Sequence, residues 1–198
     1  IGFCLVGSEM CIRDSSYANA LLARVLSEIP DLECIVGVRR GGAEVARAMD
    51  RPEHMHLVEV GTARPQTGRK ASRLGTAIAR RLPTSVADGL RRAEDWMLRR
   101  APLSSSERTI ERIPEAMAEI HHLRPSHLLV VDDAVDSGLT LKHVVGVLRA
   151  SCNFPVEILT AAVTATRVSA ERAVDPDFVL FDGTLIRFPW STDYRPDR

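Results

Sequence analysis

The sequence predicts an α/β fold with a mostly parallel central sheet flanked by helices. Short apolar runs rich in β-branched residues alternate with amphipathic stretches, and polar or glycine-rich turns follow several of the apolar runs. Strands that alternate with helices in this way favour parallel pairing through right-handed crossovers. The chain has 198 residues, which fits one domain with an embellishment.

The elements follow one another along most of the chain. Helices are expected over residues 16–29, 43–49, 74–100, 106–122 and 141–150, from apolar residues at helical spacing or from helical composition, with Pro83 as a break in the third of these segments. Strands are expected at the short apolar runs 34–38, 56–60, 127–131, 156–163, 178–181 and 185–188. The connections 61–70 and 132–140 are expected to be loops. Residues 71–123 contain no expected strand, so we interpret them as a helical insertion in a single domain spanning 16–198.

Residues 1–15 are set apart from the rest of the chain. They resemble a translated sequencing-adapter scar of the kind found at the ends of some environmental reading frames, and we expect them to be non-native. A genuine N-terminal strand is the alternative interpretation.

Composition narrows the class of protein. Lys and Arg number 26 and Asp and Glu also number 26, so no net charge points to a nucleic-acid partner. No apolar run approaches the roughly 20 residues that a membrane helix needs. The four cysteines lack metal-ligand spacing and are typical of reduced thiols. We therefore expect a cytoplasmic protein without membrane or nucleic-acid partners.

Charge is nevertheless uneven along the chain. Residues 64–100 contain ten basic residues and three acidic ones. This excess could serve an anionic ligand or a partner, although the usual fate of such residues is a solvated face.

Residues 130–140, Val-Val-Asp-Asp-Ala-Val-Asp-Ser-Gly-Leu-Thr, have the chemistry of a phosphate site. The strand leads to the carboxyl edge of the sheet, where α/β proteins bind ligands. Gly138 would let the backbone approach an anion, and the hydroxyl groups of Ser137 and Thr140 are donors. The helix that follows would add free backbone N–H groups and a positive dipole end.

Asp132 and Asp133 would repel a bare phosphate, but they suit a sugar phosphate. Their carboxylates can accept hydrogen bonds from sugar hydroxyl groups and balance a cation. The alternative is that the Asp-Asp and Ser-Gly pairs only form a turn after the strand.

The same eleven residues resemble the PRPP-binding motif of type I phosphoribosyltransferases, with the 6-oxopurine enzymes as the nearest branch. The resemblance implies a type I phosphoribosyltransferase fold. It also implies transfer of ribose 5-phosphate from PRPP to a nitrogen base, assisted by Mg2+. By this resemblance Asp132 and Asp133 hold the ribose hydroxyls and, with Asp193, the Mg2+ ion. The 5-phosphate would contact Ala134, Val135, Asp136, Ser137, Gly138, Leu139 and Thr140.

Two further segments match the family in order. Arg39, Arg40, Gly41 and Gly42 resemble its pyrophosphate-binding turn, although they could also be an ordinary strand-to-helix turn. Residues 61–70 stand where the family has a mobile catalytic loop. In that loop Arg64 would act in catalysis, and Arg69 and Lys70 would bind pyrophosphate, unless they are solvated charges.

The base is less clearly indicated. Asp136 stands where the 6-oxopurine enzymes have an acceptor for purine N7, and its alternative role is to cap the next helix. Arg167, Leu185, Ile186 and Trp190 would contact the base, although Trp190 could instead be a core or interface aromatic. Two of these depart from the family: Arg167 lies where a Lys is usual, and Leu185 replaces an aromatic residue.

The resulting interpretation is a purine-salvage phosphoribosyltransferase that takes PRPP and a nucleobase-like acceptor. The alternatives are a same-fold enzyme with a non-purine acceptor and a non-catalytic regulator that binds PRPP or a nucleotide. Because small enzymes of this family commonly assemble, a homo-oligomer, either dimer or tetramer, is expected.

Overall fold

The computed structural model describes residues 4–6, 9–11, 16–38, 40–63, 109–111, 113–167 and 169–190. Residues 1–63 and 110–198 belong to one compact unit, and residues 64–109 are assigned to a second one.

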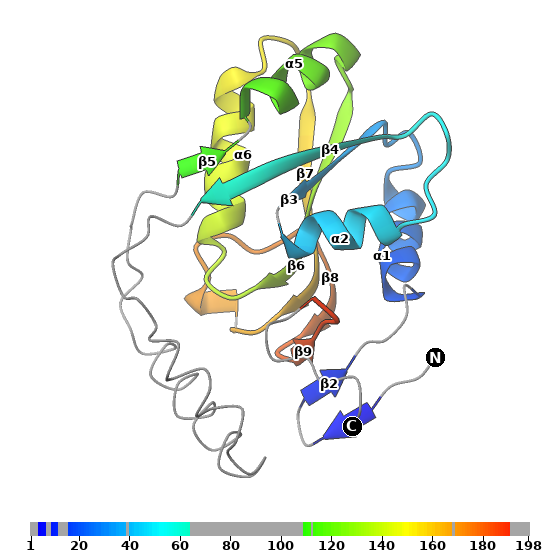
Figure 1. The fold of residues 1–198 in the computed structure, drawn as a ribbon, viewed down its shortest axis with the longest axis vertical. Coiled ribbons are helices and arrows are strands. Elements are labelled where there is room, and N and C mark those ends of the chain that lie inside the picture. Colours follow the sequence, from blue (N-terminus) through cyan, green and yellow to red (C-terminus); the bar gives the residue numbers. More distant parts are fainter. Residues whose placement is uncertain are drawn as a thin grey trace. The chain divides into compact units, whose positions relative to one another are not determined.

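A six-stranded sheet forms the centre of the first unit, in the order β5-β4-β3-β6-β7-β8 (Figure 1). The strands are β3 (Cys34–Val38), β4 (His56–Ala63), β5 (Thr109–Glu111), β6 (His127–Val135), β7 (Glu157–Ala165) and β8 (Phe178–Asp182). β3 pairs in parallel with β4 and β6, and β7 pairs in parallel with β6 and β8. The predicted α/β fold with a mostly parallel sheet is therefore confirmed.

Helices cover both faces of the sheet. They are α1 (Ser16–Glu28), α2 (Gly41–Ala48), α5 (Ile113–Leu123) and α6 (Leu139–Ser151), with a 3-10 turn at Ser169–Glu171. Ile35 of β3 packs in the core with α1 and α2, whereas its neighbour Val36 packs in the core with α5 and α6. Adjacent residues of a strand point to opposite faces, which explains this division. None of the described helices has the length and apolar character needed to cross a bilayer.

A smaller sheet has the order β1-β2-β9. Its strands are β1 (Cys4–Val6), β2 (Glu9–Cys11) and β9 (Leu185–Arg187). β2 pairs antiparallel with β1 and parallel with β9. Residues 1–15 thus contain two short strands among the residues that are described, and whether these residues are native stays a prediction.

Several predicted boundaries were wrong. β6 continues through the acidic pair to Val135, because Asp132, Ala134 and Val135 still pair with β7. The expected loop 132–140 is therefore reduced to the bends at 136–138.

Two helices begin earlier than expected, at Gly41 and Leu139, so both glycine-containing turns run directly into helices.

The region expected to be helical over 106–122 contains an edge strand, β5, and α5 begins only at Ile113. β-Branched Thr109 and Ile110 suit a strand beside β4, and Pro114 is tolerated in the first turn of a helix. α5 packs against β4, and its Met117 and Ile120 enter the core.

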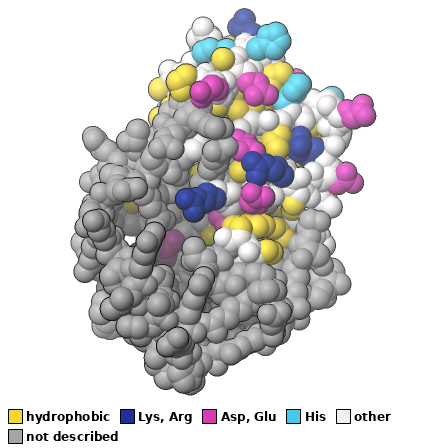
Figure 2. All heavy atoms as spheres, in the orientation of Figure 1, with side chains coloured by type: hydrophobic (Ala, Val, Ile, Leu, Met, Phe, Trp, Pro, Cys, Tyr) yellow, Lys and Arg dark blue, Asp and Glu magenta, His cyan; other side chains and the backbone are white. Residues whose placement is uncertain are grey.

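Charges of both signs are interspersed on the surface that Figure 2 shows. Among the described residues drawn there, Lys and Arg side chains lie between Asp and Glu side chains, and neither sign gathers over a large area.

Candidate functional site

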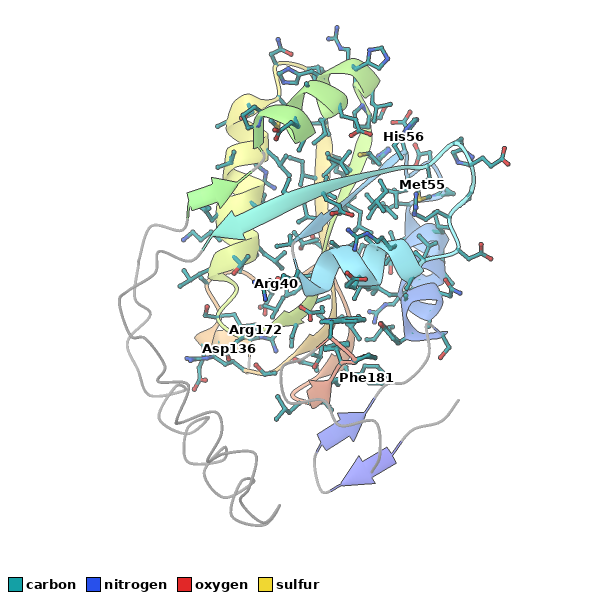
Figure 3. All side chains as sticks on the ribbon, in the orientation of Figure 1. Arg40, Met55, His56, Asp136, Arg172 and Phe181 are labelled. Atoms are coloured by element: carbon teal, nitrogen blue, oxygen red, sulfur yellow. The ribbon has the colours of Figure 1, made fainter. Side chains whose placement is uncertain are left out.

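Two of the residues predicted to carry chemistry, Arg40 and Asp136, lie at one edge of the sheet with Arg172, which was not predicted. Arg40 follows β3, Asp136 follows β6 and Arg172 follows β7, and these strands are parallel. Figure 3 shows the three side chains toward one end of the sheet, with Met55 and His56 at the start of β4 toward the other end. The carboxyl ends of parallel strands are the usual ligand site of such sheets.

The Gly41–Gly42 turn packs directly on the acidic pair of β6. A β-carbon built on Gly41 would overlap the carboxylate oxygens of Asp133. One built on Gly42 would overlap the carbonyl oxygen of Val131 and lie 2.8 Å from the Cα atom of Asp132. Gly42 is therefore required, because the atoms in its way are backbone atoms, whereas a side chain at position 41 would have to displace the Asp133 carboxylate. This close approach brings the predicted pyrophosphate turn and the predicted ribose-binding residues into contact.

The Asp133 carboxylate is held at both oxygens. Its Oδ1 atom accepts a hydrogen bond of 2.9 Å from the backbone N–H of Ala134. Its Oδ2 atom accepts one of 2.8 Å from the indole N–H of Trp190. The neighbouring Asp132 accepts a 3.0 Å bond at Oδ1 from the Asp133 N–H. The two acidic side chains are half-buried, and their orientation is set by the protein before any ligand is present.

Trp190 is itself packed in place. Its ring is stacked on that of Phe188, with centroids 5.1 Å apart and an interplanar angle of 10°. Phe188 in turn makes an edge contact with Tyr17 of α1, at 6.0 Å between centroids. Trp190 thus connects the acidic pair to the part of the core that packs with α1 and α2. Its predicted contact with the base stays a prediction.

The segment between β6 and α6 is fixed by the loop that follows β7. Gly138 has a positive φ of 70°, and a β-carbon on it would overlap the carbonyl oxygen of Val174. The Ala173 N–H donates to the Ser137 carbonyl at 2.8 Å, and the Thr166 N–H donates to the Val135 carbonyl at 2.9 Å. No side chain caps the start of α6. The first-turn N–H groups of a helix have no partner within the helix, so this end suits an anion.

Asp136 and Arg167 form an ion pair. The Nε–H of Arg167 donates to Oδ1 of Asp136 at 2.9 Å, and the hydroxyl of Thr166 donates to the same oxygen at 3.0 Å. The Arg167 side chain is 7% exposed and that of Asp136 is 53% exposed. The structure thus brings together a predicted catalytic residue and a predicted base-binding residue, with the carboxylate facing solvent.

Arg172 is a part of this edge that sequence reasoning missed. Its side chain is 3% exposed, and its Nε–H donates to the Arg167 carbonyl at 2.7 Å. Its guanidinium also pairs with Asp175 at 2.8 Å and with Asp182 at the end of β8. One local feature of the sequence could have indicated that Arg172 is paired, namely Asp175 three residues downstream. Arg172 fixes the loop that carries Thr166 and Arg167.

The other predicted site residues differ in how exposed they are, and some lie outside the described part of the chain. Leu185 is an exposed apolar side chain, 39% accessible, and Ile186 is buried in the core cluster that also contains Phe188. Arg40 is exposed at the start of α2, and its carbonyl accepts from the Glu44 N–H at 3.4 Å. The predicted residues that lie outside the described part of the chain are Arg39, Arg64, Arg69, Lys70 and Asp193.

The acidic pair fits the expected Mg2+ ion by its chemistry. The described residues contain no group of three or more His, Cys, Asp or Glu side chains arranged to hold a metal. Mg2+ is commonly bound through one or two carboxylates together with substrate phosphates, and it prefers oxygen ligands. Asp132 and Asp133 offer such oxygens beside the predicted pyrophosphate turn.

No protein-family model and no curated protein matches the chain. Solved structures do resemble it. The purine phosphoribosyltransferase of Pyrococcus horikoshii is 16% identical with a TM-score of 0.55, over 97% of this chain and 100% of that one. The xanthine-guanine-hypoxanthine phosphoribosyltransferase of Helicobacter pylori is 20% identical with a TM-score of 0.56, over 90% and 88%.

A third similar structure is a hypothetical protein from Neisseria gonorrhoeae with bound ppGpp. It is 13% identical with a TM-score of 0.54, over 90% of this chain and 85% of that one. Structural similarity at such low sequence identities establishes a shared fold and nothing further. The sheet order, the helices on both faces and these neighbours together show that the chain has the phosphoribosyltransferase fold.

Proposed function

We propose that this chain transfers ribose 5-phosphate from PRPP to a purine-like base and releases pyrophosphate. The contact between the Gly41–Gly42 turn and the Asp132–Asp133 pair is the observation that carries the proposal. PRPP has a ribose with a phosphate at one end and a pyrophosphate at the other. The start of α6, the acidic pair and the glycine turn offer a complementary group for each of these three parts. The acidic pair lies in the last part of β6, the start of α6 follows that strand, and the glycine turn follows the adjacent strand β3.

The reaction is a substitution at C1 of the ribose. The C1–O bond breaks and its electron pair leaves with pyrophosphate, while a bond forms between C1 and a nitrogen of the base on the opposite face. Asp132 and Asp133 would hold Mg2+, which would supply charge neutralisation for the leaving group. The chain contributes positioning and further positive charge, with Arg40 at the start of α2 and Arg64, Arg69 and Lys70 as proposed partners of pyrophosphate.

Asp136 is the proposed acceptor for an N–H of the base. A ring N–H becomes more acidic as the other ring nitrogen bonds to C1, so a carboxylate acceptor stabilises the transition state. Thr166 and Arg167 both bind Oδ1, which fixes the carboxylate while leaving it half exposed to a ligand.

The acceptor base has a second candidate class. Leu185 offers an exposed apolar surface but no aromatic ring for stacking. Arg167 is buried and is already bound to Asp136, so its guanidinium is engaged within the protein before a base binds. These two features favour a non-purine heterocycle as the alternative acceptor.

A non-catalytic nucleotide-binding regulator is the second candidate function. The Neisseria gonorrhoeae structure with bound ppGpp has the same fold as this chain, and ppGpp also presents a ribose with pyrophosphate groups. The same segments at the sheet edge would then bind a guanine nucleotide without transferring it.

One experiment separates these functions. The protein is incubated with PRPP, Mg2+ and a panel of purine and non-purine bases, and pyrophosphate release is followed, while calorimetry measures binding of PRPP and of ppGpp. We expect release with a purine base. Nucleotide binding with no release from any base would overturn the enzyme proposal in favour of the regulator. The same preparation, measured by sedimentation, would test the proposed dimer or tetramer.

A further inference from the structure

We propose that Trp190 is a positioning residue: its indole N–H locks the Asp133 carboxylate against the Gly41 turn and so holds the ribose and pyrophosphate ends of the site in register. This inference rests on the proposed use of PRPP. It gives Trp190 a role that does not involve stacking on a base.

Three independent constraints act on the Asp133 carboxylate. The Ala134 N–H holds Oδ1 at 2.9 Å, and the Trp190 N–H holds Oδ2 at 2.8 Å. The third constraint is steric, because the carboxylate fills the space that a β-carbon on Gly41 would need. The terminal torsion of an Asp side chain is otherwise broad. Of the three constraints, the indole bond is the one contributed by a side chain.

Trp190 can impose this orientation because its own ring is fixed. The stack on Phe188 and the edge contact between Phe188 and Tyr17 anchor the indole to α1 and the core. Phe188 is only 2% exposed. The indole N–H is a donor and never an acceptor, so in this contact it can only present a proton to Oδ2.

The bond leaves Asp133 able to bind a ligand. Each carboxylate oxygen has two lone pairs, so Oδ1 and Oδ2 can each accept one more hydrogen bond or ligate a cation. Rotation of the carboxylate would turn these lone pairs out of the direction that the indole bond gives them. Loss of the indole N–H should therefore lower the affinity for PRPP more than it lowers the affinity for a base.

The first test is Trp190→Phe, which keeps an aromatic ring for the stack on Phe188 and removes the N–H. We expect PRPP affinity, measured by calorimetry with Mg2+, to fall roughly tenfold, the loss typical of one hydrogen bond to a charged group. The KM for PRPP should rise more than kcat falls. The melting temperature controls for general destabilisation and should stay within a few degrees.

The decisive test is a double-mutant cycle with Asp133→Ala. If Trp190 acts through Asp133, Trp190→Phe causes no further loss of PRPP affinity once Asp133 is already Ala. An equal loss in both backgrounds would overturn the proposal, as would unchanged PRPP affinity of the Trp190→Phe variant. If the unaltered protein fails to bind PRPP at all, the proposed function itself falls, and this inference with it.

A ligand-free measurement checks the contact. The chain has two tryptophans, so Trp96→Phe leaves Trp190 as the sole indole. In that background Asp133→Ala should shift the Raman band that reports hydrogen bonding of the indole N–H toward its free position. An unshifted band would show that the bond to Asp133 is absent in solution and would overturn the proposal whatever the activity.

Discussion

The backbone of Val174 occupies the space where Gly138 would carry a side chain. A β-carbon on Gly138 would overlap the Val174 carbonyl oxygen and lie 2.9 Å from its amide nitrogen. The loop after β7 therefore packs tightly on the turn that begins α6. The sequence predicted that Gly138 lets an anion approach the backbone, and this stays a prediction. The structure shows a different reason for a glycine at this position, which is its contact with Val174.

Gly138→Ala should destabilise the fold strongly. The residue combines a φ of 70° with the overlap on Val174, so we expect the free energy of unfolding to fall by at least about 2 kcal/mol. Gly146→Ala is the matched control in the same helix, because its β-carbon would meet nothing within 4 Å. It should stabilise by up to about 1 kcal/mol. Urea denaturation measures both, and equal effects of the two substitutions would contradict this account.

Arg172→Met should loosen the loop after β7. It removes a guanidinium that is 3% exposed, and with it a donor to the Arg167 carbonyl and to the carboxylates of Asp175 and Asp182. Asp175 and Asp182 are 48% and 66% exposed, and water can replace much of what they lose. We therefore expect a loss of about 1–3 kcal/mol in the free energy of unfolding.

Arg47→Met is the comparison for Arg172. Arg47 also contacts two carboxylates, those of Glu44 and Glu59, but its side chain is 45% exposed. Its loss should cost less than about 1 kcal/mol. Thermal unfolding of the two variants decides whether burial sets the size of the effect, and equal losses would show that it does not.

Thr166→Val should slow turnover without weakening PRPP binding. The substitution keeps the shape of the side chain and removes one of two donors to Oδ1 of Asp136. We expect kcat to fall about three- to tenfold, the loss of one ordinary hydrogen bond. Asp136→Asn should lower kcat further with the same PRPP affinity. A parallel loss of PRPP affinity in either variant would place Asp136 in the phosphate site instead.

Cys34 should be inert as a thiol. Burial, with smaller contributions from Glu119 and Glu33, raises its pKa from 9.0 to about 12. In a Cys4→Ser, Cys11→Ser background, a disulfide reagent at pH 8 should modify the partly exposed Cys152 first and reach Cys34 only on unfolding. Two thiols reacting at equal rates in the folded protein would disprove this.

The raised pKa of Cys34 also makes the free energy of unfolding depend on pH. The buried thiol favours its protonated form, so its contribution is fully present below pH 9 and is lost as pH rises toward 12. Denaturation curves of the unaltered chain and of Cys34→Ala, measured from pH 8 to 11, should converge as pH rises. Parallel curves would mean that Cys34 does not titrate differently in the two states.

Much of the fold was predictable because buried parallel strands are short apolar runs. β3 was predicted with its observed bounds, Cys34–Val38, and β8 was predicted to within one residue. The acidic end of β6 was not, because polar residues after an apolar run indicate a loop. Pairing with β7 overrides that local preference as far as Val135. β5 was missed because three residues carry too little pattern to outweigh a helical neighbourhood.

The site was predictable where one segment carries the chemistry. The acidic pair, the glycine turn and the start of α6 could each be recognised locally, and the sheet brings them to one edge. Contacts between distant segments could not be foreseen. Arg172 binds the end of β8, and Trp190 binds Asp133 from 57 residues away. The sequence assigned Trp190 and Arg167 to the base, and nothing local indicated that both would bind carboxylates.

The bond between Trp190 and Asp133 also sets an order of events during synthesis. The glycine turn and the acidic pair are synthesised well before residue 190. Until that residue has been added, the Asp133 carboxylate lacks its indole donor. The carboxylate orientation that we propose for PRPP binding is therefore complete only once residue 190 has been synthesised.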